Sequence, residues 1–292
     1  MKRINYLAAA ALLLSLGCTK DDKTVAVTSV TLAPTTLTLE VGTTGELTAT
    51  VAPDNATDKN VTWASDITAV ATVSGGTVTA VAPGEATITA KAGEQSATCK
   101  VTVIPVGAVD LGLSVYWATC NLGANSPGEY GDYYAWGETE TKENYNVETY
   151  KWYSSIFTKY NTADNKTVLD PEDDVAHVNL GGSWRVPTIG EVDELMSTQN
   201  NSSYQWEWKS LNGHNGWLVT YLVNNNSIFF PAAGYRYDTR LTNVGSRGDC
   251  WSSSLSTDFP DRAWYVYFDG GGVDRGYNRY RCYGFPVRPV SE

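Results

Sequence analysis

Few residues in this sequence are of the types that perform catalysis. The chain of 292 residues has only two histidines, which leaves little for imidazole-based catalysis or a zinc site. Cys250 and Cys282 are the closest candidates for a thiol pair, but neither has a histidine near it in the sequence to lower the thiol pKa. Asp258 and Asp261 could act together on a glycoside, although acidic residues are also common on binding surfaces. We therefore expect that the protein is not an enzyme.

Four acidic residues stand close together at Asp170, Glu172, Asp173 and Asp174. Carboxylate oxygens suit calcium, but these acids lack the alternate-residue spacing of a calcium loop. They also fit the first turn of a helix that begins at Pro171, because acidic side chains oppose the positive end of the helix dipole. Both interpretations stay open, and we assign no metal-binding residue and no cofactor.

The segment Ala263–Phe268 alternates with the period of a β-strand. One side carries core-type residues, namely Trp264, Val266 and Phe268. The other side carries Tyr265, Tyr267 and Asp269. The stretch that follows, up to Arg281, mixes Gly, Tyr, Arg, Asn and Asp without an apolar period, whereas Gly284–Val290 predicts a short closing strand. Tyrosine beside charged residues favours a recognition surface here.

Composition narrows the class of partner. The net charge of −11 would repel nucleic acid at long range, so we exclude it as a partner. Ten Trp and eighteen Tyr are many for this length, and such aromatic residues are favoured at recognition surfaces as well as in cores.

The N-terminus predicts export and anchoring. A basic start precedes the apolar run Tyr6–Leu16, which is too short to span a bilayer of ~30 Å. "LLLSLGC" resembles a lipoprotein signal over residues 1–17, although the two positions before Gly17 depart from its commonest form, and it implies a lipidated Cys18. "CTKDDK" resembles the signal that sends lipoproteins of Bacteroidetes-type bacteria to the outer face of the outer membrane. We expect an outer-membrane lipid anchor facing the extracellular side, with residues 18–26 as a tether.

Four further cysteines remain, at Cys99, Cys120, Cys250 and Cys282. Export permits disulfides, but four cysteines allow three pairings and the sequence does not choose among them or exclude free thiols.

Residues 27–103 contain short alternating runs separated by turn signals, which predicts an antiparallel sandwich of about seven strands. "VTWASD" and "GTVTAVAPGEATITA" resemble the bacterial Ig-like group 2 family. The resemblance implies a spacer or adhesion module without chemistry of its own, in which Trp63 belongs to the core.

A linker at residues 104–108 precedes a second domain at 109–292. Its clearest helix is Thr188–Ser197, where Thr188 and Glu191 fit a capping box and the apolar residues fall on one face. "GGSWRVPTIGEVDEL", "FPAAGYR", "WSSS" and "YGFPVRPV", in this order, resemble the C-type-lectin-fold domains of the Fibrobacter succinogenes major paralogous type. The expected fold class is therefore an all-β Ig-like sandwich followed by an α+β C-type-lectin-like domain. Such a domain carries a binding surface on a twisted sheet near its C-terminus.

Residues 250–290 form the C-terminal display region, and Cys250–Val290 is similar to the variable region of diversity-generating-retroelement target proteins. In those proteins mutagenesis rewrites surface positions on a fixed scaffold. The resemblance implies that the fixed positions are Trp251, Ser252, Trp264, Val266, Phe268, Gly284, Phe285, Val287, Arg288 and Pro289. It implies that the ligand-binding positions are Asp258, Phe259, Asp261, Arg262, Tyr265, Tyr267, Asp269, Asp274, Arg275, Tyr277, Asn278, Arg279, Arg281 and Tyr283. A paralogue without the mutagenesis system fits the same residues.

The sequence thus predicts a lipid-anchored surface protein of the adhesin or receptor type, which binds an unidentified protein or glycan through its C-terminal face. Two alternatives stay open. One is a fimbrial or structural surface subunit that uses this face for self-assembly. The other is a calcium-dependent glycan-binding lectin, although "CWSSSL" stands where such lectins carry a Trp-Asn-Asp motif.

Overall fold

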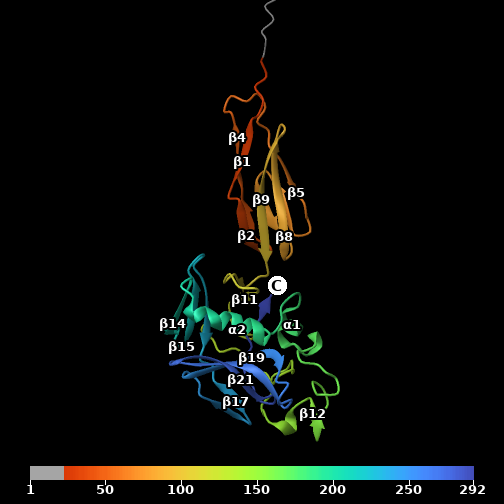
Figure 1. The fold of residues 1–292 in the computed structure, drawn as a ribbon, viewed down its shortest axis with the longest axis vertical. Coiled ribbons are helices and arrows are strands. Elements are labelled where there is room, and N and C mark those ends of the chain that lie inside the picture. The colour runs from red at the N-terminus through yellow and green to blue at the C-terminus, as the bar shows by residue number, and fades with distance from the viewer. Residues whose placement is uncertain (1–22) are drawn as a thin grey trace, which may run out of the picture.

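The computed structural model describes residues 23–292, so the predicted signal peptide and Cys18 lie outside the described residues. The side chain of Arg275 is likewise outside the described part. Two β-rich domains follow one another along the long axis of the molecule (Figure 1). None of the helices within residues 23–292 combines the length and the apolar character that a bilayer crossing requires.

The N-terminal domain is a sandwich, as expected for an Ig-like domain. Its strands are β1 (Ser29–Ala33), β2 (Thr36–Glu40), β3 (Thr44–Glu46), β4 (Thr48–Ala52), β5 (Thr62–Ser65), β6 (Ala71–Ser74), β7 (Thr77–Ala80), β8 (Gly84–Ala92) and β9 (Gln95–Ile104). They form the sheets β2-β9-β8-β5, β3-β7-β6 and β1-β4. The pairing is antiparallel except between β2 and β9, which run parallel.

The core of this domain follows from the alternation of the strands. Val78, Ile88 and Val101 are fully buried between the sheets. Trp63 packs against this core while remaining partly exposed. β9 ends at Ile104, which is buried with Trp184 of the C-terminal domain, so the junction between the domains is packed.

The C-terminal domain contains more strand than helix. Its strands are β10 (Ala108–Val109), β11 (Tyr116–Ala118), β12 (Tyr153–Ser154), β13 (Ile156–Phe157), β14 (Tyr204–Leu211), β15 (His214–Tyr221), β16 (Asn226–Pro231), β17 (Tyr235–Tyr237), β18 (Arg240–Thr242), β19 (Arg247–Leu255), β20 (Arg262–Asp269), β21 (Gly272–Tyr280) and β22 (Val290–Ser291). Its helices are η1 (Val147–Thr149), η2 (Pro171–Asp173), α1 (Val175–Leu180), α2 (Ile189–Ser197) and η3 (Thr198–Asn200). The larger sheets are the antiparallel β14-β15-β16 and β19-β20-β21.

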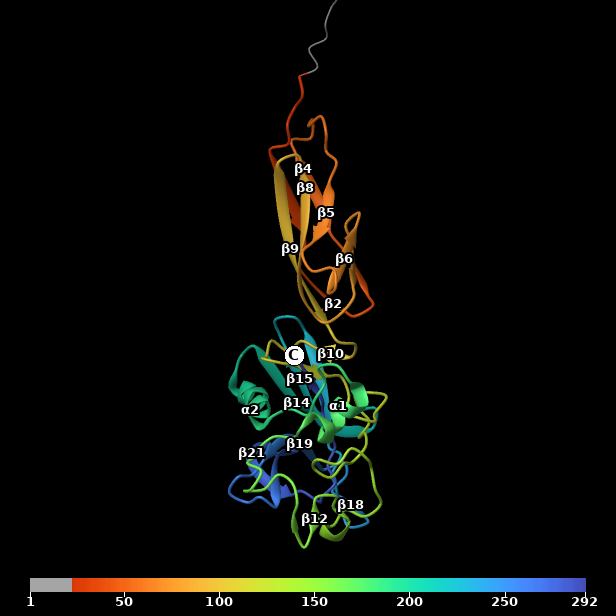
Figure 2. The same cartoon turned by 90° about the vertical axis from the view of Figure 1, so that its right-hand side faces the viewer.

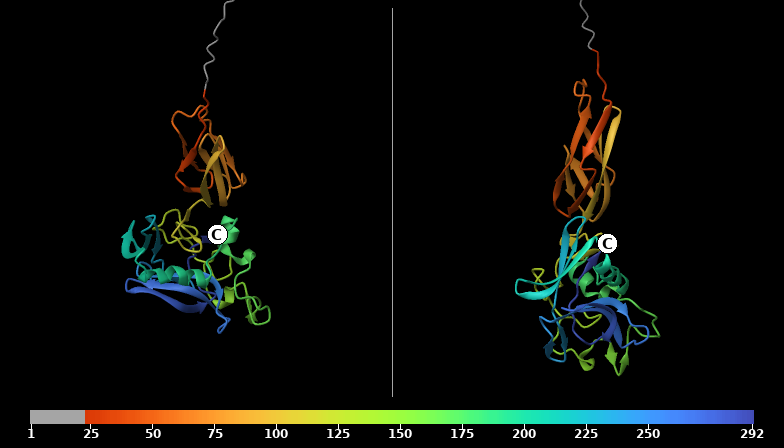
Figure 3. Two further views of the ribbon diagram at one scale, coloured as in Figure 1. Left: turned by 45° about the horizontal axis from the view of Figure 1, so that its top comes forward. Right: turned by 60° about the vertical axis from the view of Figure 1, so that its left-hand side comes forward.

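Helix α2 forms where the sequence predicts it. The Thr188 hydroxyl accepts a hydrogen bond from the Glu191 N–H, and the Glu191 carboxylate accepts one from the Thr188 N–H, which completes the capping box. Val192, Leu195 and Met196 are buried against both larger sheets, including Val266 and Phe268 of β20. Figure 3 shows α2 lying along the sheet β19-β20-β21.

The opposite face of β20 packs on a second core. Tyr265 is buried with Trp251 and Phe285, and the rings of Trp251 and Phe285 stack with their centroids 4.1 Å apart. The predicted division of β20 into two faces is therefore confirmed, although Trp264 is only partly buried. The other predicted scaffold positions are all buried.

The predicted closing strand over Gly284–Val290 is wrong in its extent. Only Val290 and Ser291 form a strand, which pairs with β11. Gly284 and Phe285 each form a single bridge, to Arg236 and Tyr134. Pro286 and Pro289 have no N–H to donate, so the run cannot form a continuous ladder, even though it is buried throughout.

Candidate ligand-binding site on the C-terminal sheet

The side of sheet β19-β20-β21 that faces away from α2 carries a hollow of about 630 Å³. We call it the tyrosine hollow; its lining residues are Arg247, Tyr265, Tyr267, Asp269, Gly271, Gly272, Val273, Asp274, Tyr277 and Arg279. Figures 1 and 2 show α2 between the Ig-like domain and this sheet. The hollow therefore faces away from the Ig-like domain and from the N-terminal end of the chain.

A β-bulge sets which side chains of β21 reach the hollow. Tyr277 is paired with Tyr265, but Asp274 is paired with Tyr267, so β21 has one more residue than β20 between these pairs. Gly276 lies within the bulge with φ +88°, a left-handed conformation that glycine adopts without steric cost. Asp274 and Tyr277 are three residues apart and would face opposite sides of a regular strand. The extra residue brings both onto the face that lines the hollow.

Arg247 supports the hollow from β19. Its Nε and Nη2 donate to the two carboxylate oxygens of Asp249 at 2.7 and 2.5 Å. Asp249 is fully buried, and burial raises the pKa of its carboxyl while the paired Arg247 opposes that rise. The guanidinium also lies 4.5 Å from the centre of the Tyr267 ring and 5.0 Å from that of Tyr235. Arg247 therefore interacts with side chains of the protein itself and stabilises the wall of the hollow.

Asp269 closes the turn between β20 and β21. The Tyr267 hydroxyl donates to its Oδ2 at 2.6 Å, and the Gly271 N–H donates to its Oδ1 at 2.8 Å. The Tyr267 hydrogen bond and the Gly271 hydrogen bond lower the pKa of Asp269 below its usual value. Asp269 therefore remains charged at neutral pH and orders the tip of the hairpin.

Arg279 and Asp274 form no ion pair and no side-chain hydrogen bond with the described part of the chain. The Arg279 guanidinium lies near Tyr283 and Tyr235, with its central carbon 5.2 and 5.9 Å from the two ring centres. Its Nε has no hydrogen-bond partner among the described residues, and the side chain forms no ion pair with them. Asp274 is exposed and has no side-chain hydrogen bond within that same part of the chain. Tyr277, which lies between these two residues on β21, is 48% exposed.

A second hollow of about 500 Å³ lies beyond Arg279. Among the residues that line it are the predicted positions Asp261 and Tyr283, together with Tyr280 and Cys282. Because Arg279 of the tyrosine hollow lies close to Tyr283, the two hollows are neighbours along the sheet.

Apart from Arg275, five of the predicted ligand-binding positions line neither hollow, namely Asp258, Phe259, Arg262, Asn278 and Arg281. Asp258 and Phe259 are exposed, and the guanidinium of Arg262 lies 4.9 Å from the Phe259 ring centre. Arg262 also donates to the side chain of Asn278 at 3.3 Å. The side chain of Arg275 lies outside the described part of the structure.

Two of the predicted surface residues are buried. Tyr265 is 3% exposed because Trp251 and Phe285 cover it, and it forms the floor of the tyrosine hollow. Arg281 is fully buried, and its guanidinium lies 4.1 Å from the ring centre of Phe157. Its Nη1 donates to the carbonyls of Lys159 and Tyr160, and burial lowers its pKa. The prediction that Arg281 is displayed is therefore wrong.

Further residues that shape the site were not predicted from the sequence. Arg247 and Asp249 stand two apart on one strand, so their pairing on one face could have been inferred from spacing. Tyr235 comes from β17 and stacks on Tyr283, and no local pattern connects these two tyrosines.

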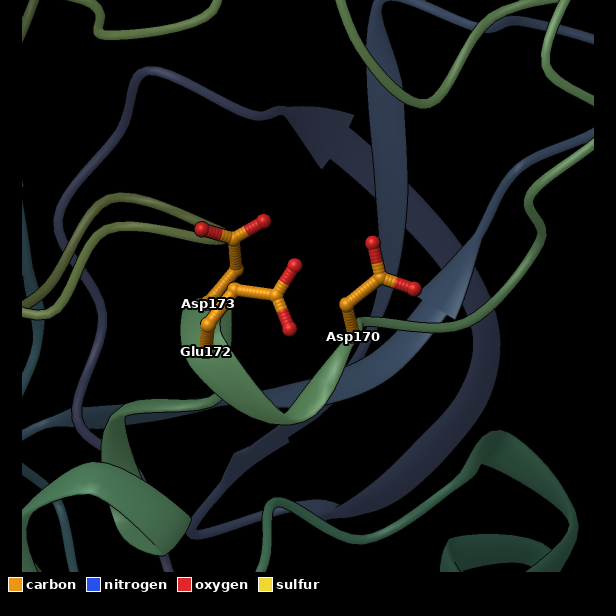
Figure 4. Close-up of side chains that lie close together, drawn as sticks. All are labelled: Asp170, Glu172 and Asp173. Atoms are coloured by element: carbon orange, nitrogen blue, oxygen red, sulfur yellow. The ribbon is translucent and has the colours of Figure 1, made fainter.

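The acidic cluster already has cations in contact with it. Figure 4 shows the carboxylates of Asp170, Glu172 and Asp173 close together. The Lys159 ammonium lies 2.6, 3.3 and 2.5 Å from them in that order. Asp173 also forms an ion pair with Lys151 at 3.2 Å.

The structure supports the interpretation of these acids as the start of a helix, except that two short helices form here instead of one. Pro171–Asp173 forms the short helix η2, and Asp174 caps α1 by accepting hydrogen bonds from the Ala176 and His177 N–H groups at 3.0 Å. Lysines therefore neutralise the first three acids, and the fourth has a structural role.

An activated cysteine nucleophile has a lowered pKa, whereas the surroundings of Cys250 and Cys282 raise the pKa of their thiols. Cys99, Cys120, Cys250 and Cys282 are all free, so these four cysteines form no disulfide. Burial raises the pKa of Cys250 to about 12 and that of Cys282 to about 11. Both thiols are therefore protonated at neutral pH.

The fold and the hollow define a class of protein: a β-rich chain in which an Ig-like sandwich precedes a domain with a recessed, tyrosine-lined surface. Residues 108–290, well over half of the chain, match the family described as the Lcl C-terminal domain, and the chain belongs to this family. Residues 26–103 match the bacterial Ig-like domain (group 2), as the sequence predicted.

Two curated proteins are similar to part of the chain. The "Ig-like virion protein" of Serratia phage KSP90 is 49% identical over 83 residues, which are 27% of this chain and 32% of that protein. The "Alpha-L-arabinofuranosidase" of Bifidobacterium longum subsp. longum is 53% identical over 66 residues, which are 22% of this chain and 6% of that protein. The chain thus spans about a third or less of the length of these relatives.

Among solved structures, domains 4 and 5 of the S-layer protein SbsC are 26% identical with a TM-score of 0.25, over 27% of this chain and 53% of that one. Domains 5–6 of the same protein cover 90% of this chain and 97% of that one at 14% identity, with a TM-score of 0.26. TM-scores this low carry no structural conclusion.

Proposed function

We propose that this protein is a lipid-anchored ligand-binding protein of the bacterial cell surface, and that the tyrosine hollow is its binding site. One observation carries the proposal. Six of the residues assigned to ligand binding from the sequence line this single hollow, namely Tyr265, Tyr267, Asp269, Asp274, Tyr277 and Arg279. A buried core of Trp251 and Phe285 holds the sheet beneath them. A fixed scaffold that presents rigid aromatic and charged side chains is suited to recognition.

The arrangement of the domains supports display. Lipid on Cys18 would hold the N-terminal end at the outer membrane, facing outward, and the Ig-like domain would act as a stalk. Helix α2 lies between the Ig-like domain and the sheet β19-β20-β21 (Figure 2), and the hollow is on the other side of that sheet. We assign the C-terminal domain to the C-type-lectin-like fold, in which a sheet backed by helix α2 carries the site. Many anchored copies would bind with an avidity that offsets weak single contacts.

We further propose that the protein binds its ligand without turning it over. The Cys250 and Cys282 thiols are protonated at neutral pH, and neither histidine lines either hollow. Turnover by the purified protein that disappears in Cys250→Ala or Cys282→Ala would contradict this proposal.

Binding is tested with arrays of glycans and of bacterial and host proteins, probed with the full chain. We expect Tyr277→Ala and Arg279→Ala to abolish capture while the melting temperature stays within about 2 °C of the parent, because both side chains are partly exposed. Arg240→Ala, on exposed β18 outside both hollows, is the matched control. A large drop in melting temperature in either test variant would make this stretch structural.

Anchoring has its own test. In cells that express the parent chain, labelled fatty acid should be incorporated into the protein. Mild protease treatment of intact cells should remove the protein from the cell surface. Cys18→Ala should abolish the label.

Three further possibilities have separate tests. A nearby reverse transcriptase with a near-identical template repeat would establish diversification by a retroelement. Glycan capture that a chelator abolishes would favour the calcium-dependent lectin, which the lysines around Asp170 and Asp173 disfavour. Filaments or ordered arrays formed by the purified chain would favour a structural subunit.

A further inference from the structure

The charged side chains of the tyrosine hollow whose polar groups are free to bind a ligand are fewer than the charged side chains that line it. Arg247 is paired with the buried Asp249, and Asp269 accepts hydrogen bonds from Tyr267 and Gly271. Asp274 and Arg279 have no such partner among the described residues. Asp269 keeps its charge, but its two carboxylate oxygens already accept these hydrogen bonds. Within the described residues, a ligand therefore meets one acid and one base whose polar groups are free to bind it.

These two charges lie on one face of β21 with Tyr277 between them. Asp274 and Arg279 are five residues apart, and the bulge absorbs one of those steps. At about 3.3 Å per residue, their Cα atoms lie roughly 13 Å apart along the strand. The site thus presents an acid, an aromatic ring and a base in a line.

This arrangement disfavours carbohydrate as the ligand. A polyanionic glycan would meet Asp274 with like charge, on a protein whose net charge is −11. A neutral glycan could hydrogen-bond to Asp274 and Arg279 through its hydroxyl groups but would supply an opposite charge to neither. Both contacts would therefore lack the ion-pair attraction that a charged ligand provides. A polypeptide carries both signs, and in an extended peptide the side chains at i and i+4 lie on one face, also about 13 Å apart.

The edge of the sheet indicates whether such a peptide would be recognised by side chains or by adding a strand to the sheet. β21 is the outer strand of its sheet, but the bulge at Gly276 interrupts its regular pattern of N–H and C=O groups. Bulges of this kind limit the addition of a further strand. Recognition by side chains is therefore favoured over strand addition.

We propose that the ligand of the tyrosine hollow is a polypeptide segment with side chains of opposite charge about four residues apart. Its basic side chain meets Asp274, its acidic side chain meets Arg279, and an apolar or aromatic residue between them packs on Tyr277. This inference rests on the proposed function, because it names the ligand class of the same site.

The test is a displayed library of random peptides, selected on the full chain and on two charge-reversed variants, Asp274→Lys and Arg279→Glu. Peptides enriched on the parent should carry Lys or Arg and Asp or Glu at a fixed spacing of about four residues. Their affinity should fall about ten-fold or more for each variant. Peptides enriched on Arg279→Glu should carry a second basic residue in place of the acidic one. A control variant, Glu140→Lys, which reverses an exposed acid outside both hollows, should bind the parent's peptides unchanged.

Two results would overturn the inference. One is the enrichment of no peptide, or of uncharged peptides only. The other is affinity that both reversals leave unchanged. Glycan capture that Tyr277→Ala abolishes would then keep the proposed function while rejecting the polypeptide ligand. If Tyr277→Ala affected no probe at all, the proposed function itself would fail.

Discussion

Two arginines near the C-terminus are buried in very different ways. Arg288 donates to the Asn121 side chain and to the carbonyls of Ala118, Thr119 and Phe229, and burial lowers its pKa to about 10. Arg281 reaches only two carbonyls, and its Nε and Nη2 have no partner among the described residues. The first arginine joins segments distant in the sequence, whereas the second lies among aromatic rings.

We therefore expect different costs when the two are replaced. Arg288→Met should lower the free energy of unfolding by roughly 3 kcal/mol, because it leaves buried carbonyls unpaired. Arg281→Met should cost about 1 kcal/mol or less, because an apolar side chain also relieves the burial of a charge without a counter-ion. Urea denaturation followed by tryptophan fluorescence measures both values. Equal losses would show that the aromatic surroundings of Arg281 stabilise it as strongly as the carbonyls stabilise Arg288.

The hairpin tip has a pH dependence that one hydroxyl controls. Because the pKa of Asp269 is lowered in the folded protein, its stabilisation of the tip is present above the ordinary carboxyl pKa and is lost as the pH falls through the lowered value. Tyr267→Phe removes the largest cause of the shift, so the pKa of Asp269 should rise toward its ordinary value. Carbon-detected NMR titration of the carboxyl measures it. Tyr277→Phe, which does not contact Asp269 through a hydrogen bond, should leave the titration where it is.

Replacing Gly276 and Gly190 by alanine should change the stability of the fold in opposite directions. Gly276 in the bulge has φ +88° and open space for 4 Å around the point where a Cβ would stand, so Gly276→Ala costs backbone strain alone, about 1 kcal/mol. Gly190 lies in the first turn of α2, where an added Cβ would meet only the Thr188 Oγ1 at 3.9 Å, an ordinary van der Waals contact, so Gly190→Ala should stabilise by up to about 1 kcal/mol. Thermal denaturation of both variants checks the signs. If Gly276→Ala left the melting temperature unchanged, the bulge would be able to accommodate a negative φ at residue 276.

Elements with local signals were predictable, and those fixed by distant contacts were not. The capping box of Thr188 and Glu191 and the alternation of β20 both lie within a few residues, and the structure has both. The burial of Arg281 depends on Phe157, Tyr150 and Trp136, which lie more than a hundred residues earlier in a segment without periodicity. Likewise, period two placed Tyr265 on the correct face, but only Phe285 and Trp251 reveal that this part of the face is covered.

At the scale of the whole molecule, the two domains meet through a packed junction. Ile104, the last residue of β9, is buried with Ala108, Ala118 and Trp184. The predicted linker is therefore held at both of its ends, which limits how far the C-terminal domain can turn on the sandwich. A restricted junction keeps the hollow facing away from the N-terminal end.

We expect the parallel pairing of β2 with β9 to strengthen the Ig-like domain against a pull along the long axis of the molecule. A pull between the N-terminal end and the hollow is applied to the sandwich at β1 and at β9, and the hydrogen bonds of β9 to β2 and β8 lie across the pulling direction. Those bonds are loaded together in shear instead of opening one after another. Single-molecule force spectroscopy should show a higher rupture force along this axis than for a pull from Glu85 and Thr102, which are paired across β8 and β9. If the chain is an anchored binding protein as proposed, a domain that resists shear would keep a bound partner attached in flowing liquid until the contact in the hollow itself breaks.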